Sequence, residues 1–297
     1  MKKAIERVGA EQVMLVVIDG GSDWVATETM IQEIYPWISF MHCTSHEVAL
    51  IIKECFHEDM IPELHELNEW ITDAQHWFST HACSAMIKNL ARPNESTSFI
   101  WPAVTRYCGV LLKIKRFHSM KNLLRRVVSS GVYAEKNFKE DPFPPKLLGA
   151  DVWALMKRVI NTMGPLLLLC RLADGQKPVI SKLYGTQLYV RKKMEESAAI
   201  GGADSVEHKI CDVFLKRWSE MQSDIVSATY LLDPLFVDKS KHAASCTIKL
   251  WVLARKVFLL FFHSYYYVLF YYNLSLPQSF RCSELMTMTS GPVCTAH

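Results

Sequence analysis

Asp19 is the first residue in the chain placed to do chemistry. It directly follows a continuous apolar run, Val13–Ile18, and precedes Gly20 and Gly21. Such a run is typical of a strand buried in a parallel sheet, and the glycines permit a sharp turn after it. Open α/β sheets bind ligands at the carboxyl edge, and a carboxylate there suits Mg²⁺. The alternative is a plain turn in which Asp19 bonds its own backbone, and local chemistry alone favours that turn.

Cys43 and His46 form a second group, because two residues separate them and this spacing suits half of a zinc site. A closed structural zinc site needs four ligands, and no second clear pair follows. Other thiols and imidazoles nearby are His42, Cys55, His57, His65, His76, His81 and Cys83. The pattern favours a cysteine packed in the core and a histidine at a helix start, with zinc as the alternative.

A third group is basic. The stretch Ser96–Ala134 contains no acidic residue, and its centre predicts an amphipathic helix over Val110–Val128. The face opposite the apolar side carries most of its basic residues, which are Lys115, His118, Lys121, Arg125 and Arg126, while Lys113 and Arg116 intrude on the apolar side. This stripe either contacts DNA phosphates without reading sequence or is a solvated surface facing acidic neighbours.

The elements around Asp19 follow a β-α-β-α order. Ser22 or Asp23 can cap a helix that ends near Ile34, Trp37–Met41 reads as a second strand, and Ser45–Phe56 as a second helix. This order is typical of a parallel sheet with right-handed crossovers.

Beyond Phe138 the pattern is helical. The predicted helices are Val152–Met163, Pro178–Ala199 and Val206–Leu232, with Gly164-Pro165 expected to break a helix. This region has neither a phosphate-cradling glycine loop nor a Gly-x-Ser-x-Gly nucleophile turn.

Composition adds only broad limits. The chain has 297 residues and a formal net charge of +3, too mild to imply a nucleic-acid partner by itself. Its nine cysteines are irregularly spaced, and the start of the chain has no apolar signal segment. These features favour reduced thiols in a nuclear or cytosolic protein.

The tail differs from the rest of the chain. Val257–Phe280 has no charged side chain and is long enough to cross a membrane, with Lys249, Arg255 and Lys256 as a cytoplasmic flank. Five tyrosines lie in its middle, where buried hydroxyl groups are costly. The tail is therefore expected to lie outside the fold, with membrane insertion as the less favoured alternative.

Several segments, in order along the chain, resemble hAT-family DNA transposases, and more closely the domain of unknown function shared by plant relatives of those enzymes. They are Val16–Ser22, Tyr35-Pro36, Cys43–His46, Ala49–Ile52, Thr105–Tyr107, Gly164–Leu166, Arg171–Pro178, Leu183-Tyr184, Arg217-Trp218 and Ala228–Pro234. Tyr107 departs from the family's tryptophan or phenylalanine. The agreement covers most of residues 1 to 240.

The resemblance implies a partial α/β ribonuclease H-like fold, holding the last strands of a parallel sheet, followed by a mostly helical insertion and an irregular tail. The expected segments are a partial core over residues 1–60, a helical continuation with the basic helix over 61–135, the insertion over 136–245, and the hydrophobic tail over 246–297. Asp19 matches the second residue of the family's Asp-Asp-Glu metal-binding triad. Cys43 and His46 match its Cys-x-x-His pair.

Relative to the family, the chain is expected to be truncated at both ends. The first aspartate and the glutamate of the triad have no match here, and one carboxylate cannot hold two metal ions. The expected protein is therefore catalytically inactive and nuclear. It has no cofactor of its own, and binds Mg²⁺ only if another chain supplies the missing carboxylates.

The resemblance also implies partners. Weak, sequence-independent DNA binding would use Arg106, Lys115, Lys121, Arg125 and Arg126, and a protein partner would complete the two-stranded sheet. The alternatives are a protein-interaction module or, less favoured, a tail-anchored membrane protein.

Overall fold

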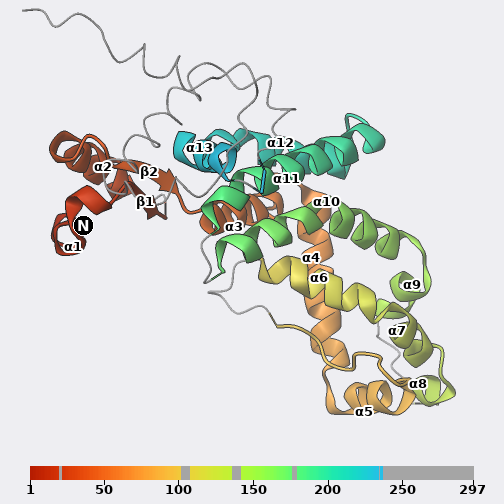
Figure 1. Cartoon of the computed structure of the whole chain (residues 1–297). Coiled ribbons are helices and arrows are strands. Elements are labelled where there is room, and N and C mark those ends of the chain that lie inside the picture. The colour runs from red at the N-terminus through yellow and green to blue at the C-terminus, as the bar shows by residue number, and fades with distance from the viewer. Residues whose placement is uncertain (20–21, 102–107, 136–141, 176–178, 234, 237–297) are drawn as a thin grey trace, which may run out of the picture. The chain divides into compact units, whose positions relative to one another are not determined.

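The computed structural model describes residues 1–19, 22–101, 108–135, 142–175, 179–233 and 235–236 (Figure 1). These residues belong to one compact unit. Arg106 and the predicted tail over residues 246–297 lie outside the described residues.

The N-terminal part is a small parallel sheet. Strand β1 (Leu15–Ile18) pairs with β2 (Ser39–His42) in a register that runs from Leu15–Ser39 to Ile18–His42. Helix α2 (Ser22–Ile34) connects them, and α1 (Lys2–Val8) with the 3₁₀ turn η1 (Ala10–Gln12) precedes them (Figure 1). The predicted parallel pair of strands is confirmed. A small apolar cluster of Ile5, Ile31 and Ile38 holds this part together.

The rest of the described chain is helical. Its elements, in order, are α3 (Thr44–Cys55), α4 (Pro62–Phe78), α5 (His81–Leu90), α6 (Gly109–Ser119), α7 (Lys121–Val128), α8 (Gly131–Glu135), α9 (Phe143–Leu148), α10 (Asp151–Ala173), α11 (Ile180–Gly201), α12 (Val206–Lys216), the 3₁₀ turn η2 (Ser219–Met221) and α13 (Asp224–Leu232). One apolar core runs from Met41 in β2 to Val226 in α13. The helical continuation and the helical insertion expected from the sequence therefore share a core with the end of the sheet.

Helix α10 is the central element of that core, because it packs against α3, α6, α11 and α12. The predicted break at Gly164-Pro165 is wrong, since α10 continues through Pro165. A proline in a helix interior removes one hydrogen bond and costs about 3 kcal/mol. Buried neighbours on both sides, including Met163 and Leu166, offset that cost.

Within the described residues, α10 is also the one helix long and apolar enough to cross a membrane. Of its most apolar window, 44% is buried inside the protein.

Two predicted long helices are each divided. The expected helix over residues 110–128 is α6 and α7, with Met120 between them at φ −87° and ψ 1°. The Ser119 hydroxyl donates to the carbonyl of Arg116 at 2.6 Å, a local bond that competes with helix continuation. The expected helix over residues 206–232 is likewise divided into α12, η2 and α13.

Candidate functional site

The carboxyl edge of the sheet holds the predicted catalytic position. Asp19 directly follows β1 and is exposed. The backbone N–H of Cys43 donates to the carbonyl of Ile18 at 2.6 Å, so the chain leaves both strands at this one edge. Cys43 is half-buried and precedes α3, and His46 lies half-buried in the first turn of that helix. Each of these three residues therefore lies near the end of a strand.

A different trio is brought together beside this edge. Donor atoms of His42, Glu47 and Glu220 all lie within 4.8 Å of one another. His42 ends β2, Glu47 is in the first turn of α3, and Glu220 comes from η2. In the described part of the chain, these three side chains are close enough together to bind one metal ion. Asp19, Cys43 and His46 do not belong to it.

Arg217 links this trio to a further carboxylate. Its Nε donates to Glu54 at 2.9 Å, and its Nη1 lies 3.5 Å from both Glu47 and Glu220. The Glu47 side chain is only 2% exposed. Burial, together with a hydrogen bond and the negative charge of Glu220, raises the pKa of Glu47, while His42 and Arg217 act in the opposite direction. Two carboxylates thus share a site with a histidine, as general acid–base and metal sites require.

Sequence reasoning missed this trio because Glu220, in η2, is far along the chain from His42 and Glu47. The available signal was Glu47 itself, a carboxylate in a helix that otherwise buries apolar residues such as Val48 and Ile51. A charged residue in that position needs a partner. Its spacing from His42 gives no recognisable ligand motif.

Two of the predicted DNA-binding residues, Arg125 and Arg126, are bonded inside the protein. The Arg125 guanidinium donates to the carbonyls of Leu147, Leu148 and Gly149 at 2.9, 3.0 and 2.5 Å. Arg126 bonds the carbonyl of Leu90 at 3.3 Å and also the carboxylate of Glu95. These arginines satisfy carbonyls at the ends of neighbouring helices. The guanidinium of Arg125 is therefore engaged with backbone carbonyls, and the charge of Arg126 is paired with Glu95.

The basic residues that intrude on the apolar side also have internal roles. Lys113 is buried, and its ammonium donates to Thr72 Oγ1 at 2.6 Å and to the carbonyl of Asn68 at 3.3 Å. Arg116 donates to the carbonyl of Ser98 at 3.3 Å. Neither side chain belongs to a free basic surface.

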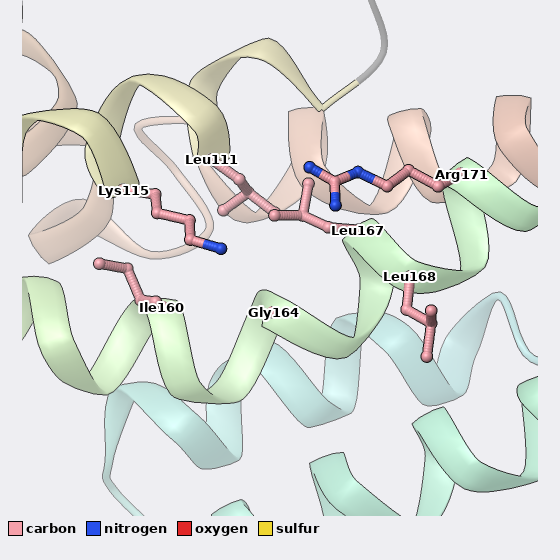
Figure 2. A pocket seen from close by; sticks show the side chains of 7 residues that line it. All are labelled: Leu111, Lys115, Ile160, Gly164, Leu167, Leu168 and Arg171. Carbon is pink, nitrogen blue, oxygen red and sulfur yellow. The ribbon is translucent and has the colours of Figure 1, made fainter.

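Lys115 and Arg171 behave differently. They line a pocket of about 190 Å³ between α6 and α10, over the apolar side chains of Leu111, Ile160, Leu167 and Leu168. Figure 2 shows the ammonium of Lys115 and the guanidinium of Arg171 directed toward each other across this pocket. Both residues are exposed, and neither forms an ion pair with a carboxylate in the described part of the chain. Their positive charges face solvent.

The positive charge continues along α10 and onto Lys121, the first residue of α7. The Lys121 ammonium lies 5.6 Å from the centre of the Trp153 ring. Burial lowers the pKa of His118, and the positive charges of Lys121 and Lys157 lower it further. On α10, Lys157, Ile160, Gly164 and Arg171 recur at helical spacing and so share a face. We call Lys115, Lys121, Lys157 and Arg171 the α6–α10 surface.

Comparison with known proteins adds no relative. No protein-family model matches the chain, and no curated protein matches it at a significant level. Function is therefore argued from the residues and their geometry.

Proposed function

We propose that this chain is a catalytically inactive relative of hAT transposases that binds double-stranded DNA, without sequence preference, through the α6–α10 surface. The observation that carries this proposal is the convergence of Lys115 and Arg171, whose charges have no carboxylate partner in the described residues. Lys121 and Lys157 extend the same surface. Arg125 and Arg126 are left out of the contact set because their donors bond backbone carbonyls.

The size of the surface suits a DNA backbone. From Lys157 to Arg171, a rise of about 1.5 Å per residue gives a span of about 21 Å along α10. That length corresponds to about six base pairs at roughly 3.4 Å each. Four cations that each neutralise a phosphate give a slope of about −3.6 in a plot of log affinity against log salt concentration. Such contacts position a protein on DNA but carry no sequence information.

The family part of the proposal rests on order and placement. The parallel β1-α2-β2 unit followed by helices is compatible with part of an α/β core and a helical insertion, and this supports the proposal. The ordered motifs quoted above support the same assignment. The resemblance assigns one catalytic carboxylate, Asp19, within these residues. We therefore propose a nuclear protein that binds DNA without cutting it, with Mg²⁺ bound only if another chain supplies the remaining carboxylates.

A second candidate function is a protein-interaction module whose partner completes the sheet. In the described residues, β1 and β2 pair only with each other, and Val17 in β1 is 53% exposed. Unpaired strand edges are templates for pairing with another chain. A sharp thermal transition of a monomeric protein, independent of its concentration, would count against this candidate.

The DNA proposal is tested by fluorescence anisotropy with a labelled duplex at about 50 mM salt, where phosphate contacts are strong. We expect the full chain to bind, and the variant Lys115→Ala/Lys157→Ala/Arg171→Ala to bind at least about tenfold more weakly. The control Lys53→Ala/Lys88→Ala/Lys182→Ala removes the same charge from exposed positions outside the surface. Circular dichroism checks that both variants fold.

Equal loss of affinity in the two variants would refute the assigned surface, and absence of binding by the wild type would refute the function. Catalytic inactivity is tested separately by incubating supercoiled plasmid with the protein and Mg²⁺. Nicking by the wild type that disappears in Asp19→Asn would show that the site at the sheet edge is active.

A further inference from the structure

The trio His42, Glu47 and Glu220 plays no part in the proposed DNA contact. Two consecutive elements, β2 and α3, and the distant turn η2 bring it together. It combines an imidazole nitrogen with carboxylate oxygens, and all of the donor atoms lie within 4.8 Å. Imidazole and carboxylate are the ligands that first-row divalent metals take in proteins.

The charge around the trio is unbalanced. Arg217 contacts Glu47, Glu54 and Glu220. Three carboxylates around one guanidinium leave two negative charges when His42 is neutral. Glu47 is almost fully buried, and an uncompensated buried carboxylate is costly. A bound divalent cation would balance this charge.

Unpaired polar atoms provide an independent observation. His42 Nδ1 is shielded from solvent and lies 3.3 Å from Glu47 Oε1, yet it makes no hydrogen bond within the described residues. In the next turn, Thr44 and Ser45 are 2% and 1% exposed, and their hydroxyl oxygens also have no partner there. Native proteins satisfy most buried polar atoms. A bound cation would give His42 Nδ1 such a partner.

An ion can reach the trio from solvent. The side chains of His42 and Glu220 are 31% and 45% exposed, whereas Glu47 forms the buried floor. Ligand atoms bound tetrahedrally at about 2.1 Å from one ion lie about 3.4 Å from one another. Donor atoms that lie up to 4.8 Å apart must therefore approach by up to about 1.4 Å, which rotation of the exposed Glu220 can supply.

We propose that His42, Glu47 and Glu220 bind a divalent transition-metal ion. The histidine nitrogen disfavours Mg²⁺, which prefers oxygen ligands, and suits Mn²⁺ or Zn²⁺. Three protein ligands leave further coordination positions for water. Arg217 keeps its bond to Glu54 when the carboxylates of Glu47 and Glu220 turn toward the ion.

The test titrates the full chain with Mn²⁺ and follows the free ion by electron paramagnetic resonance. Mn²⁺ is the chosen probe because the chain has nine cysteines, and soft thiolates select other metals. We expect one Mn²⁺ per chain. Glu220→Gln keeps the side-chain shape but removes a charged ligand, so affinity should fall at least about tenfold.

The matched control is Asp224→Asn, which removes the same charge from an exposed residue in α13 outside the trio. It should bind Mn²⁺ as the wild type does. His42→Ala, a second exposed ligand variant, should also weaken binding. A dissociation constant of about 1 mM is the weak end of the range for metal sites. Absence of Mn²⁺ binding by the wild type at about that concentration would therefore overturn the proposal. Undiminished affinity in Glu220→Gln would overturn it equally.

Discussion

Replacing Arg125 by alanine should destabilise the protein, because this guanidinium joins α7 to the end of α9. It donates three hydrogen bonds to the carbonyls of Leu147, Leu148 and Gly149. Those carbonyls lie at the end of α9. In the alanine variant the Leu147 carbonyl keeps the hydrogen bond that Trp153 Nε1 donates at 2.8 Å, whereas the carbonyls of Leu148 and Gly149 lose the bonds from Arg125.

The magnitude follows from those bonds. A hydrogen bond from a charged donor contributes about 1.5–3 kcal/mol when buried. Arg125 is half-buried, so water replaces part of the loss and the expected cost is about 2 kcal/mol. For a unit of this size, that corresponds to a melting temperature lower by about 4–8 °C. The midpoint of urea unfolding should fall by about 0.7 M if the slope is about 3 kcal/mol per molar.

Urea unfolding followed by circular dichroism measures this change. Arg125→Lys should recover less than half of the loss, because one ammonium cannot reproduce the planar guanidinium that reaches three carbonyls. A matched control is Lys192→Ala, an exposed cation on α11 whose side chain is 75% exposed. Stability of Arg125→Ala within about 0.5 kcal/mol of wild type, which is the range of ordinary surface substitutions, would refute the reasoning.

Three further predictions concern buried charges. Arg158 Nε and Nη2 lie 2.6 and 2.5 Å from the two carboxylate oxygens of Glu207. Glu207→Gln breaks this ion pair and should lower the free energy of unfolding by about 2 kcal/mol, a moderate loss because the Arg158 side chain is half exposed. The hydrogen bond from Arg158 lowers the pKa of Glu207. The stabilisation by this ion pair is therefore present above the ordinary carboxyl pKa and is lost as pH falls through the lowered pKa of Glu207. Urea unfolding of wild type and variant across acid pH measures this loss. Burial and Glu220 raise the pKa of Glu47, so Glu47 costs stability as pH rises from the ordinary carboxyl pKa through the raised one. In metal-free urea unfolding, the stability of Glu47→Gln relative to wild type should therefore increase with pH over that window, and a constant difference would refute this. Burial lowers the pKa of Lys113, so replacing it by an apolar side chain of similar size in Lys113→Met should change the free energy of unfolding by less than about 1 kcal/mol. DNA affinity in the anisotropy assay should be unchanged. A large loss of affinity would place Lys113 on the DNA-binding surface.

Local patterns were sufficient for the N-terminal elements. The apolar run before Asp19 predicts β1, because a buried strand needs little more than consecutive apolar residues and a turn. The break predicted at Gly164-Pro165 is wrong because helix propensity depends on the local sequence, whereas α10 is stabilised by packing against helices from distant parts of the chain. The extent of a helix in this protein is therefore decided by packing.

The candidate sites were less visible in the sequence, for the same reason. Arg125 and Lys115 lie in one basic stripe of the sequence, yet the first bonds backbone carbonyls of α9 and the second faces an open pocket. Every residue has a backbone carbonyl, so the sequence does not show which carbonyls will accept a hydrogen bond from Arg125. Likewise, Cys43 and His46 have ligand spacing, but the residues that meet are their neighbours His42 and Glu47, joined by Glu220 from η2.

The most direct test of the central claim is the salt dependence of DNA affinity. For wild type, log affinity against log salt concentration should have a slope of about −3.6 if all four cations of the α6–α10 surface contact phosphates. Lys115→Ala/Lys157→Ala/Arg171→Ala should make that slope less steep by about 2.7, because three phosphate contacts are lost. The triple control at Lys53, Lys88 and Lys182 should leave it unchanged. Equal slopes for wild type and the α6–α10 variant would contradict the account.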